Sequence, residues 1–141
     1  FKTETTPFNV MNTPFSRDIT KEIVDAFRKE GIAIGFYFSP EDFNYFHANQ
    51  IPIGRLQLPQ HFPANNPGLM EYDKKQLKEL FSNYGKIDIL FSIINSKITK
   101  QYSAISKLNN TCISISIAAS MAFNFPLQYS IRIILTHTKS I

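Results

Sequence analysis

The spacing of apolar residues predicts a helix followed by a buried strand near the start of the chain. Apolar side chains recur at intervals of three and four residues, as on one helix face, at Ile19, Ile23, Ala26 and Phe27. Residues 13–18 have the features of a helix start. They offer a capping hydroxyl, a proline for the first turn and an acidic residue near the positive end of the helix dipole. Gly31 predicts its end. Ile32–Phe38 is then almost continuously apolar, which is typical of a parallel strand buried on both faces.

A long connection separates this strand from a second helix–strand pair. It runs from about Glu41 to Pro67, and loops of that length in compact domains are usually functional. The second helix is predicted over Leu69–Tyr84, Gly85 stops it, and Ile87–Phe91 begins another strand. One largely apolar face of that helix is predicted to hold Leu69, Tyr72, Gln76, Leu77, Leu80, Phe81 and Tyr84. This order predicts consecutive βα units of an α/β fold. Because the chain lacks a glycine-rich phosphate loop, a partial, TIM-like (β/α) barrel is favoured over a nucleotide-binding sheet.

Composition changes abruptly at Phe91. All eleven acidic residues and all five glycines precede position 92, whereas residues 92–141 contain eleven Ile and nine Ser. Within this Ile/Ser-rich tail, Ile113–Ile117 alternates with the period of a strand and Ile131–Leu135 is a second β-like stretch. A folded domain needs turn residues and charges of both signs on its surface. The tail is therefore interpreted as frame-shifted or unspliced sequence rather than a genuine second domain.

Charge and reactive residues exclude several classes of function. The formal charge of +4 arises from the tail, since residues 1–91 hold ten Lys/Arg against eleven Asp/Glu. The five basic residues of the tail are scattered without interleaved aromatics, which argues against nucleic acid. The three His lack metal-ligand spacing and Cys112 is alone, so neither a metal nor another cofactor is expected. Residues 108–131 are uncharged, but Asn, Gln and Pro interrupt them and disfavour a membrane span.

Three collinear segments within residues 1–91 resemble α-L-fucosidases of glycoside hydrolase family 29. The run NVMNTPFSRD at residues 9–18 is similar to the family's segment before its third strand. Lys29–Ile32 followed by Gly35–Pro40 resembles the family's E-G-(I/L)-x-x-G-x-Y-x-S-P strand. Gln76–Leu80 and Asn83–Phe91 resemble the helix and strand that lead into the family's nucleophile.

The resemblance implies a retaining hydrolase that removes terminal α-L-fucose from glycans on a (β/α) barrel. Such enzymes use two carboxyl groups about 5 Å apart. In the family the nucleophile is an Asp two positions after an aromatic residue. Here Phe91 is that aromatic and Ile93 stands at the nucleophile position, with no acid after it to act as the acid/base residue. The expectation is therefore residues 1–91 as a barrel fragment without catalytic residues, and residues 92–141 as a non-homologous tail.

One substrate-binding residue is implied by the resemblance. Tyr37 matches the Tyr that reaches the sugar in the family, and its partner would be a fucosylated glycan or fucoside. The alternative for Tyr37 is a large strand residue packed between helices. The alternatives for the whole chain are a non-catalytic carbohydrate-binding relative or an unrelated α/β binding module. Family members are usually secreted, periplasmic or lysosomal, and no signal peptide is visible at Phe1.

Three further groups have a structural interpretation beside a functional one. Arg17 and Asp18 form either a functional pair or, as favoured here, part of a helix cap. Glu41-Asp42 could be paired carboxylates, but neighbours on an extended chain point apart, so a solvated loop is favoured. The aromatic group of residues 43–47 fits either a sugar-stacking wall or the packing of a long loop.

Overall fold

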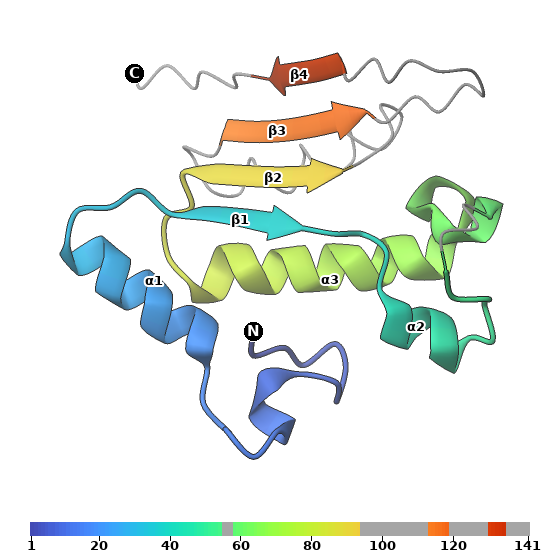
Figure 1. Ribbon diagram of the computed structural model, residues 1–141, viewed down its shortest axis with the longest axis horizontal. Helices are drawn as coiled ribbons and strands as arrows, with labels where there is room; N and C mark the ends of the chain where they lie inside the picture. The colour runs from blue at the N-terminus through green and yellow to red at the C-terminus, as the bar shows by residue number, and fades with distance from the viewer. Residues whose placement is uncertain (55–57, 94–112, 119–129, 135–141) are drawn as a thin grey trace.

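The chain is an α/β structure in which two helices pack on one side of a mixed sheet (Figure 1). The computed structural model describes residues 1–54, 58–93, 113–118 and 130–134. The four described strands follow the order β1-β2-β3-β4. In Figure 1 the helices α1 and α3 lie together below β1, while β3 and β4 extend the sheet above β2.

The two strands predicted from apolar runs are confirmed as parallel neighbours. Strand β1 is Gly35–Phe38 and β2 is Ile89–Ile93, and Tyr37 pairs in register with Phe91. Both strands begin two or three residues later than the apolar runs that predicted them. Ile34 lies before β1, but its carbonyl accepts hydrogen bonds from the backbone N–H groups of Asp88 (2.8 Å) and Ile89 (3.1 Å).

The two β-like stretches of the tail are also strands. Strand β3, Ile113–Ala118, pairs parallel with β2, and β4, Ser130–Ile134, pairs antiparallel with β3. The antiparallel β4 departs from the all-parallel order of a (β/α) barrel. The predicted division at residue 91 falls inside β2, whose ladders to β1 and β3 both include Phe91. That division stays a prediction.

Helix α1, Ile19–Lys29, begins later than predicted. Asp18 is its N-cap and accepts a hydrogen bond from the backbone N–H of Lys21 at 3.2 Å. Thr13 instead ends a separate 3-10 turn, η1, at Val10–Asn12, so its hydroxyl does not cap the helix. The end of α1 is as predicted. Gly31 has φ +72°, and the N–H groups of Gly31 and Ile32 bond back to the last turn.

The apolar stripe predicted on α1 is exposed in the described structure. Ile19, Ile23 and Phe27 are exposed, and the buried residue of α1 is Val24, one position along from Ile23. The described chain covers only the flank of α1 that faces β1 and α3. Periodicity therefore identified the apolar face of α1, and the described residues leave that face exposed.

Helix α3, Pro67–Asn83, supplies most of the core. The helix begins two positions earlier than predicted. Its N-cap, Asn66, accepts a hydrogen bond from the backbone N–H of Leu69 at 3.1 Å. Its buried side chains meet those of α1, β1 and β2, which all project to the same face of the sheet. The core cluster is Val24, Ile34, Phe38, Met70, Leu77, Leu80, Phe81, Tyr84, Ile87 and Leu90. The predicted apolar face of this helix is thus confirmed in its main positions.

The long connection after β1 is structured, which corrects its prediction as a loop. It contains the helix α2, Phe43–Ala48, and the 3-10 turns η2, Pro59–His61, and η3, Pro63–Asn65. Asp42 starts α2 by accepting from the N–H of Tyr45 at 2.8 Å. Both η2 and η3 begin with a proline, whose fixed φ suits the first position of a helix.

Among the described residues, no helix is long and apolar enough to cross a membrane. Most of the uncharged stretch at residues 108–131 lies outside the described ranges.

Two glycines at helix ends offer a matched test of the α1–α3 contact. Gly31 and Gly85 have φ of +72° and +70°, where any L side chain is strained. A Cβ at Gly31 meets nothing within 4 Å, whereas one at Gly85 lies 3.2–3.4 Å from the Arg28 guanidinium. We expect Gly31→Ala to lower the free energy of unfolding by about 1 kcal/mol and Gly85→Ala by about 2 kcal/mol. Urea denaturation measures both, and equal losses would show that Arg28 moves aside without cost.

Candidate functional site

Tyr37, near the carboxyl end of β1, is exposed and forms an aromatic pair with the half-buried Phe91 of β2. Along β1, Phe38 packs toward the helices, so Tyr37 projects to the opposite face. Tyr37 is 59% exposed, and its ring lies beside that of Phe91, with centroids 5.5 Å apart and planes tilted by 31°. Tyr37 is therefore not a strand residue packed between helices. The carboxyl ends of parallel strands are where α/β folds place their ligand sites.

No carboxylate accompanies this pair in the described part of β2. The strand ends at Ile93, the expected nucleophile position. Asp88 lies at the other end of β2 and has a structural role. Its Oδ2 accepts from the backbone N–H of Ile34 at 2.9 Å, and Oδ1 lies 2.9 Å from Lys86 Nζ. The Ile34 N–H, followed by the bond from Lys86, holds the pKa of Asp88 below its usual range.

Arg17 and Asp18 do not act on a common group. Arg17 forms an exposed ion pair with Glu22. Asp18 caps α1 with Oδ1 and accepts the hydroxyl of Tyr84 with Oδ2 at 2.7 Å. The favoured interpretation of Asp18 as a cap is confirmed. Burial, followed by the bond to Asp18, raises the pKa of Tyr84.

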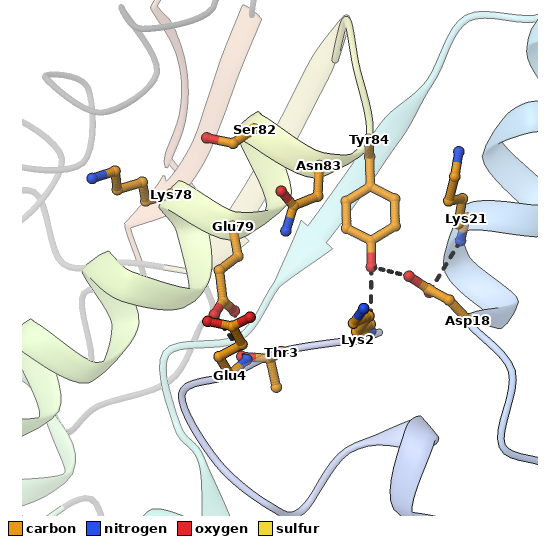
Figure 2. Close-up of a pocket in the computed structure, with 10 residues that line it drawn as sticks. All are labelled: Lys2, Thr3, Glu4, Asp18, Lys21, Lys78, Glu79, Ser82, Asn83 and Tyr84. Atoms are coloured by element: carbon orange, nitrogen blue, oxygen red, sulfur yellow. Dashed lines mark hydrogen bonds between the residues drawn. The ribbon is translucent and has the colours of Figure 1, made fainter.

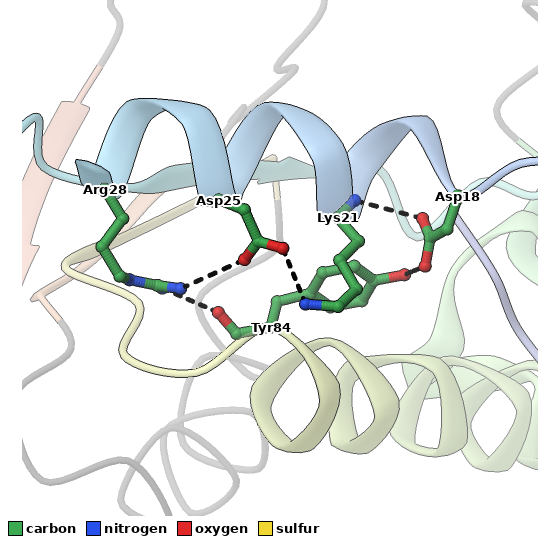
Figure 3. Close-up of polar contacts among 5 residues, drawn as sticks. All are labelled: Asp18, Lys21, Asp25, Arg28 and Tyr84. Carbon is green, nitrogen blue, oxygen red and sulfur yellow. Dashed lines mark hydrogen bonds and ion pairs between the residues drawn. The ribbon is translucent and has the colours of Figure 1, made fainter. Parts of the chain in front are cut away.

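Tyr84 joins α3 to both ends of α1 (Figure 3). Its hydroxyl reaches Asp18 at the start of α1, and its backbone carbonyl accepts from Arg28 Nη2 at 2.7 Å near the end of α1. Arg28 also donates to the carbonyl of Lys86 at 3.0 Å. The guanidinium satisfies the carbonyl of Tyr84, the C-cap of α3, and that of Lys86 just beyond it. The sequence placed Tyr84 on a buried face, but nothing in the local pattern pointed to Arg28.

A polar pocket of about 480 Å³ lies on the helix side of the sheet, between the N-terminal segment, α1 and α3 (Figure 2). Its carboxylates hold the N-terminal segment in place. Glu79 accepts from the hydroxyl of Thr3 and, at 2.9 Å, from the N–H of Glu4. Asp18 is engaged with Tyr84. Glu79 and Asp18 of this pocket therefore serve the fold, and Tyr37 is on the opposite face of β1.

Asp42 has a structural role, and Glu41 is exposed beside it. One carboxylate oxygen of Asp42 caps α2, and the other accepts the Tyr72 hydroxyl at 2.9 Å. The solvated loop favoured for this pair is wrong for Asp42, because Tyr72 of α3 reaches it.

Within the aromatic group of residues 43–47, one phenylalanine is buried and another is exposed. Phe46 is 1% exposed and stacks on the buried His61 ring at 4.7 Å and 18°, whereas Phe43 is 55% exposed. His61 Nε2 lies 2.7 Å from the carbonyl oxygen of Pro52. For Phe46, the interpretation as packing of the long connection therefore holds rather than the sugar-stacking wall. Within the described ranges, no group of three or more His, Cys, Asp or Glu side chains is placed to hold a metal ion.

Comparison with known families assigns the class of protein. The family model described as Alpha-L-fucosidase matches residues 1–123. The chain therefore belongs to the α-L-fucosidase family. The matched range extends past Phe91, where the motif resemblance ends, and includes β2 and β3. No curated protein sequence matches the chain.

Solved α-L-fucosidase structures share this fold. α-L-Fucosidase isoenzyme 1 from Paenibacillus thiaminolyticus is 29% identical, with a TM-score of 0.63 over 81% of this chain and 30% of that one. A variant of AlfC, an α-L-fucosidase of Lactobacillus casei, in complex with Fuca(1,6)GlcNAc is 27% identical, with a TM-score of 0.55 over 81% and 42%. A bacterial fucosidase with a pyrrolidine inhibitor, 23% identical, with a TM-score of 0.61 over 79% and 26%, supports the fold alone. The chain thus spans less than half the length of each of these relatives.

Proposed function

We propose that this chain is a segment of the (β/α) barrel of an α-L-fucosidase and that it forms part of the fucose-binding wall without the catalytic carboxylates. The observation that supports this most is the exposed Tyr37 near the carboxyl end of β1, paired with the half-buried Phe91 of the parallel strand β2. Helices on one face of β1 and β2 and exposed side chains on the other correspond to the outer and inner sides of a barrel.

Tyr37 supplies two kinds of contact with a sugar. Its hydroxyl donates and accepts hydrogen bonds, and its ring offers an apolar face to sugar C–H groups. Phe91, at 5.5 Å, restricts the ring of Tyr37 from one side. The complex of AlfC with Fuca(1,6)GlcNAc supports a fucosylated glycan as the ligand class.

The chemistry at the end of β2 separates binding from hydrolysis. Retaining glycosidases need one carboxylate as nucleophile and one as acid/base. Ile93 has no lone pair for an anomeric carbon, and the chain has no acid after Asp88. A carbohydrate-binding role without turnover is therefore the function that we assign to residues 1–91. Residues 92–141, as proposed from composition, add no catalytic group. An unrelated α/β module is excluded by the family match.

Fucose binding tests the role of Tyr37. Saturation-transfer NMR with L-fucose is expected to show binding that D-glucose does not reproduce. Tyr37→Phe should weaken it about threefold to tenfold, as expected for one hydrogen bond to an uncharged partner. Tyr45→Phe is the matched control, because the Tyr45 hydroxyl lies in the connection near Asn66. Equal affinity of the Tyr37→Phe variant and the unmodified chain would contradict a contact between this hydroxyl and the sugar.

A further inference from the structure

The first residue of β1 is a glycine that the backbone of the strand does not require. Gly35 is exposed and pairs in register with Ile89, and the pairing of β1 with β2 continues without a bulge to Phe38. Gly35 is not among the residues with positive φ. Its conformation is therefore one that any L residue adopts in a strand.

Crowding by the described residues does not require this glycine either. A Cβ at Gly35 would lie 3.5 Å from the Cβ of Ile89 and 3.7 Å from its carbonyl oxygen, which are ordinary van der Waals contacts. Glycine weakens a strand, because it loses more conformational freedom on folding and has no side chain to pack. Without a bulge or a clash to explain it, a strand glycine marks a place where another group approaches the backbone closely.

The space over Gly35 adjoins Tyr37 on the sheet face that is turned away from the helices. Strand residues two positions apart share a face, so Gly35 lies on the face of Tyr37, about 7 Å farther from the carboxyl end of β1. The register places Ile89 beside Gly35 and Phe91 beside Tyr37. We call the space over Gly35, between Ile89 and Tyr37, the Gly35 gap. A single monosaccharide can contact Tyr37 and this gap together.

The side chains beside the Gly35 gap favour a small alkyl group. Ile89 is aliphatic and 36% exposed, and Tyr37 and Phe91 add their rings. A hydroxyl placed against such groups loses hydrogen bonds to water, whereas a methyl group gains from leaving water. L-Fucose carries a methyl group at the position where L-galactose has a hydroxymethyl group. D-Arabinose in its pyranose form has the same ring configuration and only a hydrogen there.

We propose that Gly35 is a specificity-determining residue: the methyl group of L-fucose enters the Gly35 gap and contacts Ile89 while Tyr37 binds the sugar ring. The absence of a side chain at Gly35 supplies the space, and Ile89 supplies the apolar contact. The inference rests on the proposed function, from which it takes the ligand and the role of Tyr37. It adds the residue that distinguishes L-fucose from sugars of the same ring configuration.

A series of three sugars tests the proposal on the full chain. Saturation-transfer NMR titrations with L-fucose, D-arabinose and L-galactose give the affinity of each. L-Fucose is expected to bind about fourfold more tightly than D-arabinose, as expected for one buried methyl group. L-Galactose should bind no better than D-arabinose, because its extra hydroxyl meets an apolar surface. In bound L-fucose the methyl protons should receive more saturation than the ring protons.

Gly35→Ala fills the gap with one carbon and separates a binding role from a structural one. The preference for L-fucose over D-arabinose should fall from about fourfold to less than about twofold, and the excess saturation of the methyl protons should disappear. The same variant should raise Tm by about 1–4 °C, because alanine restricts the unfolded chain and fits this backbone. Gly31→Ala is the control: it strains the end of α1 and lowers stability, but it should leave the sugar preference unchanged.

An unchanged sugar preference in Gly35→Ala, or methyl protons that receive no more saturation than the ring protons, would overturn the proposal. A lower Tm for Gly35→Ala would also overturn it, because the chain itself would then fill the gap. Binding of L-fucose that Tyr37→Phe weakens and Gly35→Ala leaves selective would remove this inference alone and keep the proposed function. Failure of L-fucose to bind the unmodified chain would remove both.

Discussion

Purified chain incubated with an aryl α-L-fucoside is expected to release no phenol above the uncatalysed rate. The motif resemblance places Ile93 at the nucleophile position, and the sequence has no acid after Asp88. Asp88 itself is held at the opposite end of β2 by Ile34 and Lys86. Loss of one member of a catalytic pair removes orders of magnitude in rate, and here neither is provided.

The assay needs a positive and a negative reference. The Paenibacillus thiaminolyticus enzyme under the same conditions shows that the substrate and detection work. Ile93→Asp alone should not restore turnover, because one carboxylate without an acid/base partner cannot complete both steps. Turnover that co-purifies with the chain and disappears in the Tyr37→Phe variant would mean that another group serves as nucleophile.

Truncation of Phe46 is expected to have the largest effect on stability among single changes in the long connection. Phe46 is 1% exposed and stacks on His61, so Phe46→Ala leaves a cavity between α2 and the turn η2. We expect the free energy of unfolding to fall by about 3–5 kcal/mol. Equilibrium urea denaturation followed by far-UV circular dichroism measures this loss.

Phe43→Ala is the control for this change. Phe43 is on the same helix but exposed, so its truncation should alter the free energy of unfolding by less than about 0.5 kcal/mol. Similar losses for both variants would show that Phe46 does not stabilise the connection through its burial.

Elements that depend on local pattern were predictable from the sequence. The apolar runs at Ile32–Phe38 and Ile87–Phe91 contain the strands β1 and β2. The predicted burial on both faces is not seen for β1, because within the described residues only its helix side is covered and Tyr37 is exposed. Gly31 ends α1 because only a residue that tolerates positive φ closes this turn. The alternation at Ile113–Ile117 likewise marked β3.

Features that depend on distant partners were not predictable. The helix α2 requires Asp42, whose second oxygen is held by Tyr72 from α3, 30 positions away. The periodicity of α1 identified an apolar face, but it did not predict that the described residues leave this face exposed. Tyr37 entered as a candidate through family resemblance, since a tyrosine in a strand carries no chemical signal of its own. The structure adds its exposure and its neighbour Phe91.

The double attachment of Tyr84 has a consequence for local opening. Tyr84 donates its hydroxyl to Asp18 and accepts a hydrogen bond from Arg28 at its backbone carbonyl. Complete separation of α1 from α3 must therefore break both bonds. Partial fraying at one end of α1 therefore leaves the other end anchored. The two helices form one cooperative unit, and their slowest amides should exchange with solvent at a common rate set by the opening of the pair rather than of either helix.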